Sequence, residues 1–186
     1  MPTLIRPRDL PLAGISAHRF RGLVRSGAYE RVSRGVYLNP AAEYSEHLTV
    51  GEVFKRVPNA LVCLYSALQI HQIGTQSPGD LWIAIDHKAR LPRLDLLPVR
   101  IVRFSGRMMK LGIEEQIADG VPFRITSPAR TIVDCFRFRK FGLDVALEAL
   151  KETLRERRAT VDEINELSRT CRIRSVMKPY MEAMLA

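Results

Sequence analysis

The sequence has few of the residues from which metal and redox sites are built. It contains only three cysteines, Cys63, Cys135 and Cys171, which lie far apart, form no CxxC pair and each fall within an apolar run. This pattern predicts buried, inert thiols in a reducing compartment and argues against a structural metal site. The four histidines show no HxxxH or HExxH spacing, so the sequence gives no support for metal catalysis.

Long apolar segments and the common catalytic motifs are also missing. No apolar run approaches the length that spans a bilayer, and Met1 is followed by Arg6 and Arg8 rather than by the apolar core of a signal peptide. There is no glycine-rich phosphate loop and no GxSxG motif. We therefore predict a cytoplasmic protein that is not an enzyme and needs no metal or cofactor. A metal nuclease is the remaining enzyme hypothesis, and nothing fixes the spacing of its candidate carboxylates, Asp80, Asp86, Glu114 and Glu115.

What the sequence has in excess is positive charge. Its 186 residues carry 29 Lys and Arg against 20 Asp and Glu, a net charge of +9, and the 46% hydrophobic content is sufficient for a packed core. Residues 1–40 contain seven Arg, no Lys and two carboxylates, and so have a net charge of +5. Residues 41–120 are neutral and residues 121–186 carry +4. Such an excess of positive charge indicates an anionic partner, which could be nucleic acid or a membrane surface. The alternative is a soluble protein that is merely basic.

Residues 16–27 predict an amphipathic helix with a basic face. Ser16 is a favourable N-cap, and Phe20, Leu23 and Val24 recur at helical spacing toward a core. Gly27 falls where the helix should end, because glycine adopts the left-handed conformation at little cost. The polar side of the same turns carries arginines, whose planar guanidinium groups suit phosphates and guanine edges.

A short β-hairpin should follow this helix. Residues 28–32 and 36–38 have strand patterns, and residues 33–35 between them give a turn signal. A basic helix followed by a hairpin is the layout of a winged helix-turn-helix, in which the helix enters the major groove and the hairpin contacts the backbone or minor groove. The alternative is a surface helix and hairpin whose charges are only solvated. The predicted DNA-binding residues are Ser16, His18, Arg19, Arg21, Arg25, Arg31, Arg34 and Gly35.

The predicted module begins with less helix than usual. A winged helix normally has one or two helices before the recognition helix, whereas Pro2, Pro7 and Pro11 leave room here for about one turn. We therefore predict an α+β protein in two parts. Residues 1–40 form a partly truncated winged helix-turn-helix, and residues 41–186 form an α/β domain with a small sheet and C-terminal helices.

The second part shows strand patterns first and helical patterns later. The last two strands should join in a hairpin through Asp119-Gly120, and the whole sheet should be mixed or antiparallel. The predicted strands are 80–86, 100–104, 113–118 and 122–126. The predicted helices are 46–56, the neighbourhood of 66–71, a helix from Pro128 ended by Gly142, 144–157, one starting at the capping box of Thr160, and 175–185.

Two polar groups within apolar segments have competing interpretations. Arg130 and Asp134 are one helical turn apart and can form an ion pair, and a ligand or partner site is the alternative to this structural role. His71 has no partner at metal-ligand spacing, which favours a hydrogen-bonded core histidine over a metal ligand.

Six segments give the chain a resemblance to a known family: 14–16 (GIS), 23–27 (LVRSG), 32–37 (VSRGVY), 57–60 (VPNA), 64–68 (LYSAL) and 127–136 (SPARTIVDCF). Their order and spacing resemble the AbiEi antitoxins of type IV toxin–antitoxin systems, described as predicted transcriptional regulators of a phage-defence system. The resemblance implies an N-terminal winged helix that binds operator DNA and represses its own operon. It also implies an α/β domain that opposes a nucleotidyltransferase toxin encoded next door, without a stable complex.

We expect two partners from this resemblance, double-stranded DNA at the protein's own operator and the functionally linked toxin. A second hypothesis is a protein-binding antitoxin that neutralises its toxin by direct contact. Co-purification with the neighbouring gene product distinguishes the two.

Overall fold

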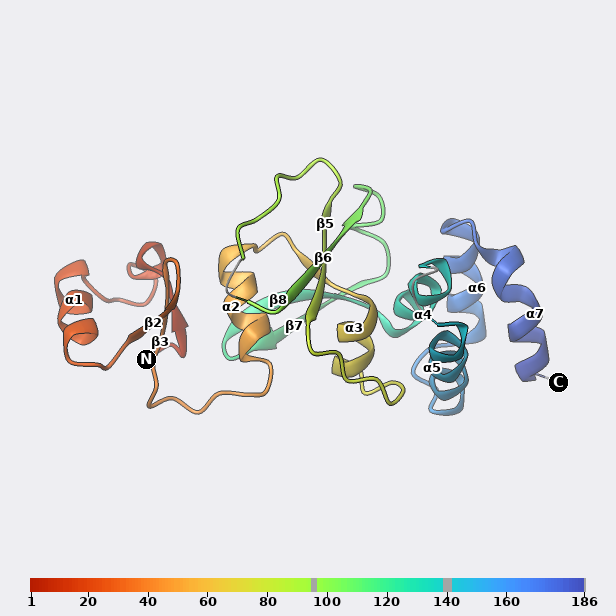
Figure 1. Ribbon diagram of the computed structural model, residues 1–186, viewed down its shortest axis with the longest axis horizontal. Helices are drawn as coiled ribbons and strands as arrows, with labels where there is room; N and C mark the ends of the chain where they lie inside the picture. The colour runs from red at the N-terminus through yellow and green to blue at the C-terminus, as the bar shows by residue number, and fades with distance from the viewer. Residues whose placement is uncertain (95–96, 139–141, 186) are drawn as a thin grey trace. The chain divides into compact units, whose positions relative to one another are not determined.

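A computed structural model describes residues 1–94, 97–138 and 142–185 (Figure 1). The chain divides into two compact units. The first comprises Met1–Ala60, Arg90–Pro98 and Glu115–Phe123, and the second comprises Leu61–Ala89, Val99–Glu114 and Arg124–Ala186. The predicted module of residues 1–40 therefore lies in a unit that also includes later segments, and its boundary at Pro40 stays a prediction.

The first 40 residues form one α-helix and a three-stranded sheet. The elements are β1 (Leu4–Ile5), a 3₁₀ helix η1 (Pro7–Asp9), α1 (Ala17–Arg25), β2 (Glu30–Ser33) and β3 (Val36–Leu38). The strands are antiparallel in the order β1-β3-β2. The predicted helix, hairpin and single leading turn are confirmed. Strand β1 was not predicted, because a strand of two residues leaves no alternating pattern.

Helix α1 packs on this sheet through aromatic side chains. The Phe20 ring is 5.0 Å from the Tyr37 ring in an edge-on arrangement and 5.6 Å from the Tyr29 ring. Such pairs contribute about 0.5–1.5 kcal/mol beyond their area burial. The Tyr29 hydroxyl donates a 2.7 Å hydrogen bond to the Pro2 carbonyl, which ties the N-terminal strand to the same core. Ile5, Leu10 and Ile15 complete that core.

Helix α2 (Leu48–Arg56) completes the first unit by packing closely on β1. A Cβ atom at Gly51 would lie 3.0 Å from Leu4 Cδ1 and 3.3 Å from the Ala118 carbonyl, so glycine permits this approach. The Phe54 ring lies 5.7 Å from the Phe123 ring. The unit therefore assembles from segments that are far apart in the sequence.

The larger sheet is mixed, which is one of the two arrangements that the sequence predicted. Its strands are β4 (Leu61–Val62), β5 (Leu81–Asp86), β6 (Val99–Phe104), β7 (Ile113–Ala118) and β8 (Val121–Thr126), in the order β6-β5-β4-β8-β7. Strand β5 pairs with β6 in parallel and with β4 in antiparallel orientation. On its other side, β4 pairs with β8 in parallel orientation. The predicted turn between β7 and β8 is confirmed, because Asp119 and Gly120 both have positive φ, 51° and 76°. Strand β4 was hidden within an apolar segment.

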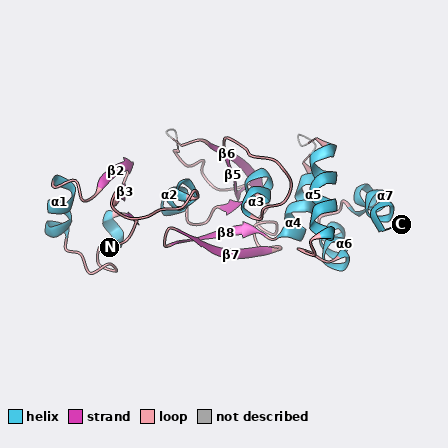
Figure 2. Ribbon diagram, turned by 90° about the horizontal axis from the view of Figure 1, so that it is seen from below, coloured by secondary structure: helices cyan, strands magenta, loops and turns pink. Residues whose placement is uncertain are grey.

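The second unit also contains five described helices. They are α3 (Leu64–Ile70), α4 (Pro128–Arg137), α5 (Leu143–Arg155), α6 (Val161–Thr170) and α7 (Arg174–Leu185). Figure 2 shows α3 beside the strands and α4–α7 grouped together. Ser127 caps α4, and Thr160 forms the predicted capping box with Glu163. Helix α4 ends before the predicted Gly142, and residues 139–141 lie outside the described part of the chain. No helix among the described residues is long and apolar enough to cross a lipid bilayer.

The core of the second unit holds the single cysteines and His71. All three thiols are free and buried, as predicted. The His71 Nε2 atom lies 2.7 Å from the Thr126 carbonyl oxygen, which confirms the hydrogen-bonded core histidine. Burial raises the pKa of the Cys63 thiol well above its usual value, so this group is an unreactive thiol at neutral pH.

The predicted ion pair of α4 is fully buried. Arg130 Nε donates to Asp134 Oδ2 at 2.9 Å, and both side chains have zero solvent exposure. Arg130 Nη1 also donates to the carbonyls of Leu111 (2.7 Å) and Met108 (3.2 Å), and its guanidinium lies 5.4 Å from the Phe104 ring centre. Burial raises the pKa of Asp134 to about 6, and the charge and hydrogen bond of Arg130 oppose this shift. These contacts support the structural role.

We predict that breaking this pair on one side destabilises the second unit more than removing it entirely. Arg130→Met leaves an unpaired buried carboxylate and should cost about 3–5 kcal/mol of unfolding free energy. The double change Arg130→Met with Asp134→Leu removes both charges and should recover part of that loss. Urea unfolding of both variants measures the difference, and equal stability of the two would contradict it.

Candidate nucleic-acid interface

Both ends of helix α1 are fixed by the residues that the sequence indicated. Ser16 Oγ accepts a 3.2 Å hydrogen bond from the Arg19 backbone N–H, which is the predicted N-cap. Gly27 has a φ of +76°, and its N–H donates to the Val24 carbonyl at 3.2 Å. The helix therefore begins and ends at defined residues, and its exposed face has a fixed orientation within the first unit.

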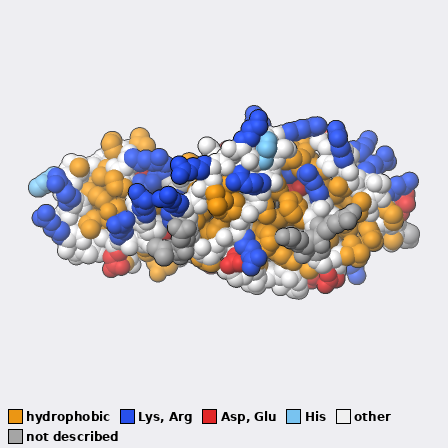
Figure 3. Space-filling view, turned by 45° about the horizontal axis from the view of Figure 1, so that its top comes forward, with side chains coloured by type: hydrophobic (Ala, Val, Ile, Leu, Met, Phe, Trp, Pro, Cys, Tyr) orange, Lys and Arg blue, Asp and Glu red, His pale blue; other side chains and the backbone are white. Residues whose placement is uncertain are grey.

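Three of the predicted basic residues share one exposed face of α1. His18, Arg21 and Arg25 are spaced by three and four residues, and all are exposed. Arg19 is also exposed, but it leaves the helix about 100° around the axis from His18. The structure thus places Arg19 beside this face rather than on it. In Figure 3, Lys and Arg side chains are distributed along the face in view, including the part of the chain that holds α1.

The hairpin contributes the other two predicted arginines. Arg31 on β2 is exposed, and its Nε donates a 3.3 Å hydrogen bond to the Ser33 carbonyl. Arg34 is exposed in the turn between β2 and β3, next to Gly35 with a φ of +74°. Because such an angle is strained for other residues, Gly35 is what permits this tight turn.

Within the described part of the chain, no carboxylate pairs with any of these five arginines, Arg19, Arg21, Arg25, Arg31 and Arg34. Their guanidinium groups are therefore available to an anion from solvent. The described residues contain no group of three or more His, Cys, Asp or Glu that could hold a metal ion. The chemistry that the site offers is recognition of phosphates and base edges by cationic donors.

Comparison with known families bears on this same segment. Residues 3–40 match a family described as "Transcriptional regulator, AbiEi antitoxin". The matched range contains α1, the hairpin and three of the six segments that carry the resemblance. The match supports a relationship to AbiEi antitoxin regulators for the N-terminal part of the chain, and the other three segments lie outside it.

Comparison with solved structures concerns the fold of almost the whole chain. The protein is similar to the RV2827C protein from Mycobacterium tuberculosis, with a TM-score of 0.55 and 18% sequence identity. The similarity covers 90% of this chain and 66% of the other, slightly less than two thirds of that protein's length. At this identity the likeness shows a shared fold. No curated protein matches the sequence.

The sequence did not indicate a second group of basic residues in the same unit. Arg6, Arg8, Lys55, Arg56 and Arg93 line one pocket together with Arg34. Arg6 and Arg8 counted toward the charge of residues 1–40, but they belong to no periodic pattern. The other three come from a segment whose charges balance, so only the folded structure brings them together.

We predict that the conformation of Gly35 is required for DNA binding. Gly35→Val forces a β-branched residue to a φ of +74°, at a cost of about 1–2 kcal/mol, and should weaken binding by displacing Arg34. Gly35→Asn is the matched control, because Asn tolerates the left-handed region. Fluorescence anisotropy with a labelled duplex compares the variants. Equal affinity of Gly35→Val and wild type would contradict a role for the hairpin.

Proposed function

We propose that this protein is a DNA-binding antitoxin that represses transcription of its own operon. It binds operator DNA in the cytoplasm through α1 and the β2–β3 hairpin of a shortened winged helix-turn-helix. The remainder of the chain opposes a nucleotidyltransferase toxin of a type IV phage-defence system, without forming a stable complex with it. No catalytic step is assigned to the protein.

One observation carries the DNA-binding part of this proposal. An exposed face of His18, Arg21 and Arg25 lies on a helix that is directly followed by a hairpin with Arg34 in its turn. This arrangement falls within the range that matches a transcriptional-regulator family. In winged-helix proteins, the recognition helix usually contacts base edges and the hairpin contacts the DNA backbone. The net charge of +5 over residues 1–40 supports an anionic partner at this site.

The face of α1 is tested by removing two of its charges. Each arginine that neutralises a phosphate contributes about 0.9 to the slope of log affinity against log salt concentration. Arg21→Ala with Arg25→Ala should therefore lower affinity for the protein's own upstream DNA and reduce that slope by up to about two. The matched control, Arg169→Ala with Arg174→Ala, removes two exposed arginines from α6 and α7 of the second unit. If both pairs change binding equally, α1 is not the recognition element.

Repression and antitoxicity should separate between the two parts of the chain. Phe136 is buried in α4, with its ring 5.6 Å from that of Tyr180. Phe136→Ala should cost about 3–5 kcal/mol, a large part of the ~5–15 kcal/mol that stabilises a typical domain. We expect this change to abolish toxin suppression, and the Arg21 and Arg25 changes to abolish repression but not suppression when expression is driven by an unrelated promoter.

Cell survival during toxin induction, beside operator binding in vitro, measures both activities for each variant. If the arginine variant loses suppression as completely as Phe136→Ala, one surface serves both activities and the division is wrong. Stable co-purification of the toxin would instead favour neutralisation by direct contact.

A further inference from the structure

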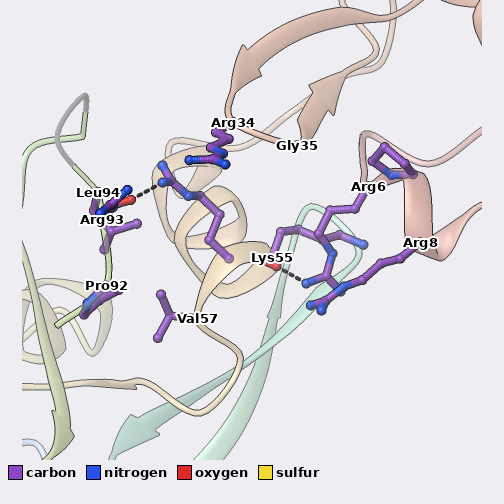
Figure 4. Close-up of a pocket in the computed structure, with 11 residues that line it drawn as sticks. Arg6, Arg8, Arg34, Gly35, Lys55, Val57, Pro92, Arg93 and Leu94 are labelled. Atoms are coloured by element: carbon purple, nitrogen blue, oxygen red, sulfur yellow. Dashed lines mark hydrogen bonds between the residues drawn. The ribbon is translucent and has the colours of Figure 1, made fainter. Parts of the chain in front are cut away.

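The first unit contains a second basic site, separate from the exposed face of α1. Its pocket has a volume of about 560 Å³ and is lined by six basic residues, Arg6, Arg8, Arg34, Lys55, Arg56 and Arg93. These residues come from the N-terminal segment, the hairpin turn, the end of α2 and the loop before β6. Figure 4 shows Arg6 and Arg8 entering from one side and Arg93 from the other, with Arg34 between them.

One carboxylate, that of Asp9, neutralises part of this charge. Asp9 Oδ1 lies 3.0 Å from Arg6 Nη2, and Asp9 Oδ2 lies 3.1 Å from Lys55 Nζ. Burial raises the pKa of Asp9, but hydrogen bonds and charge from Arg6 and Lys55 outweigh that effect and leave the pKa below its usual value. Asp9 is therefore ionised at neutral pH and holds two of the cations in place.

The other cations have no carboxylate at hydrogen-bond distance in the described part of the chain. Arg8 is exposed, and its Nε lies 4.0 Å from Asp9 Oδ1. Arg56 donates to the backbone carbonyl of Arg93, which ties the loop to α2 but leaves the charges of both side chains uncompensated. Arg34 and Arg93 are exposed. Three arginines, Arg34, Arg56 and Arg93, thus line the pocket without a carboxylate partner among the described residues, whereas Arg8 lies near the carboxylate of Asp9.

We infer that this pocket binds phosphate, and that the phosphate is the DNA backbone beside the segment that α1 contacts. Guanidinium groups bind phosphate through paired, charge-assisted hydrogen bonds. Arg34 lines the pocket and also occupies the hairpin turn of the proposed interface, so the two surfaces are continuous within the first unit. The inference rests on the proposed function and extends the contact surface to Arg8, Arg56 and Arg93.

The test uses Arg8 and Arg93, because neither side chain holds the fold together. Arg8→Ala with Arg93→Ala should reduce the salt slope of binding to the upstream duplex by up to about two. Arg8→Lys with Arg93→Lys keeps both charges and should retain most of the slope. Arg169→Ala with Arg174→Ala is again the control, and thermal unfolding verifies that each variant is folded.

Two further measurements separate the possible outcomes. If wild type and the control bind DNA and the pocket variant binds with an unchanged slope, the inference is overturned while the proposed function stands. Calorimetry with inorganic triphosphate identifies the source of the phosphate. Binding of triphosphate that depends on Arg8 and Arg93, without any effect on DNA affinity, overturns the backbone assignment in favour of a free phosphate compound. If wild type binds no DNA, the proposed function fails. If wild type also binds no triphosphate, the inference that the pocket binds phosphate is overturned too.

Discussion

The packing of Phe20 is the constraint on which the candidate interface depends. Its ring contacts those of Tyr29 and Tyr37, so it joins α1 to the residue before β2 and to β3. A helix held by one aromatic residue on its buried side presents the opposite side to solvent, and there His18, Arg21 and Arg25 lie. The same contact fixes the helix against the hairpin, so Arg34 keeps a defined position relative to α1. The direction of the basic groups thus follows from a hydrophobic contact.

The placement of carboxylates decides which cations are available to a ligand. Residues 1–40 have two acidic residues, and Asp9 is engaged by Arg6 and Lys55. Glu30 lies on β2, where it forms no ion pair within the described chain. The arginines of α1 and the hairpin form no ion pair with a carboxylate in the described chain. Their charge is therefore uncompensated and raises the local positive potential that attracts polyanions.

Elements with strong local signals could be predicted from the sequence, and those made by distant partners could not. Ser16 and Gly27 bound α1, and Asp119-Gly120 set the β7–β8 turn, because capping and turn chemistry act over a few residues. Strands β1 and β4 have two residues each and exist only through pairing with strands remote in sequence. The basic pocket has the same origin, since Arg6 and Arg93 meet only after folding. The position of Arg19 beside the basic face follows from helical periodicity alone.

Two arginines in this chain occupy the same local motif and have opposite roles. Arg19 and Arg130 each follow a capping serine by three residues, and their backbone N–H groups donate to that serine at 3.2 and 3.3 Å. Arg130 has Asp134 one turn later and is completely buried, whereas Arg19 has Leu23 at that position and is exposed. A buried guanidinium needs a carboxylate and carbonyl acceptors within the fold, so Arg130 is committed to structure. The exposed one has no such partner, and its charge remains available to an external anion. Burial, together with the pairing of Arg130 with Asp134, therefore determines which arginines can meet an anion from solvent.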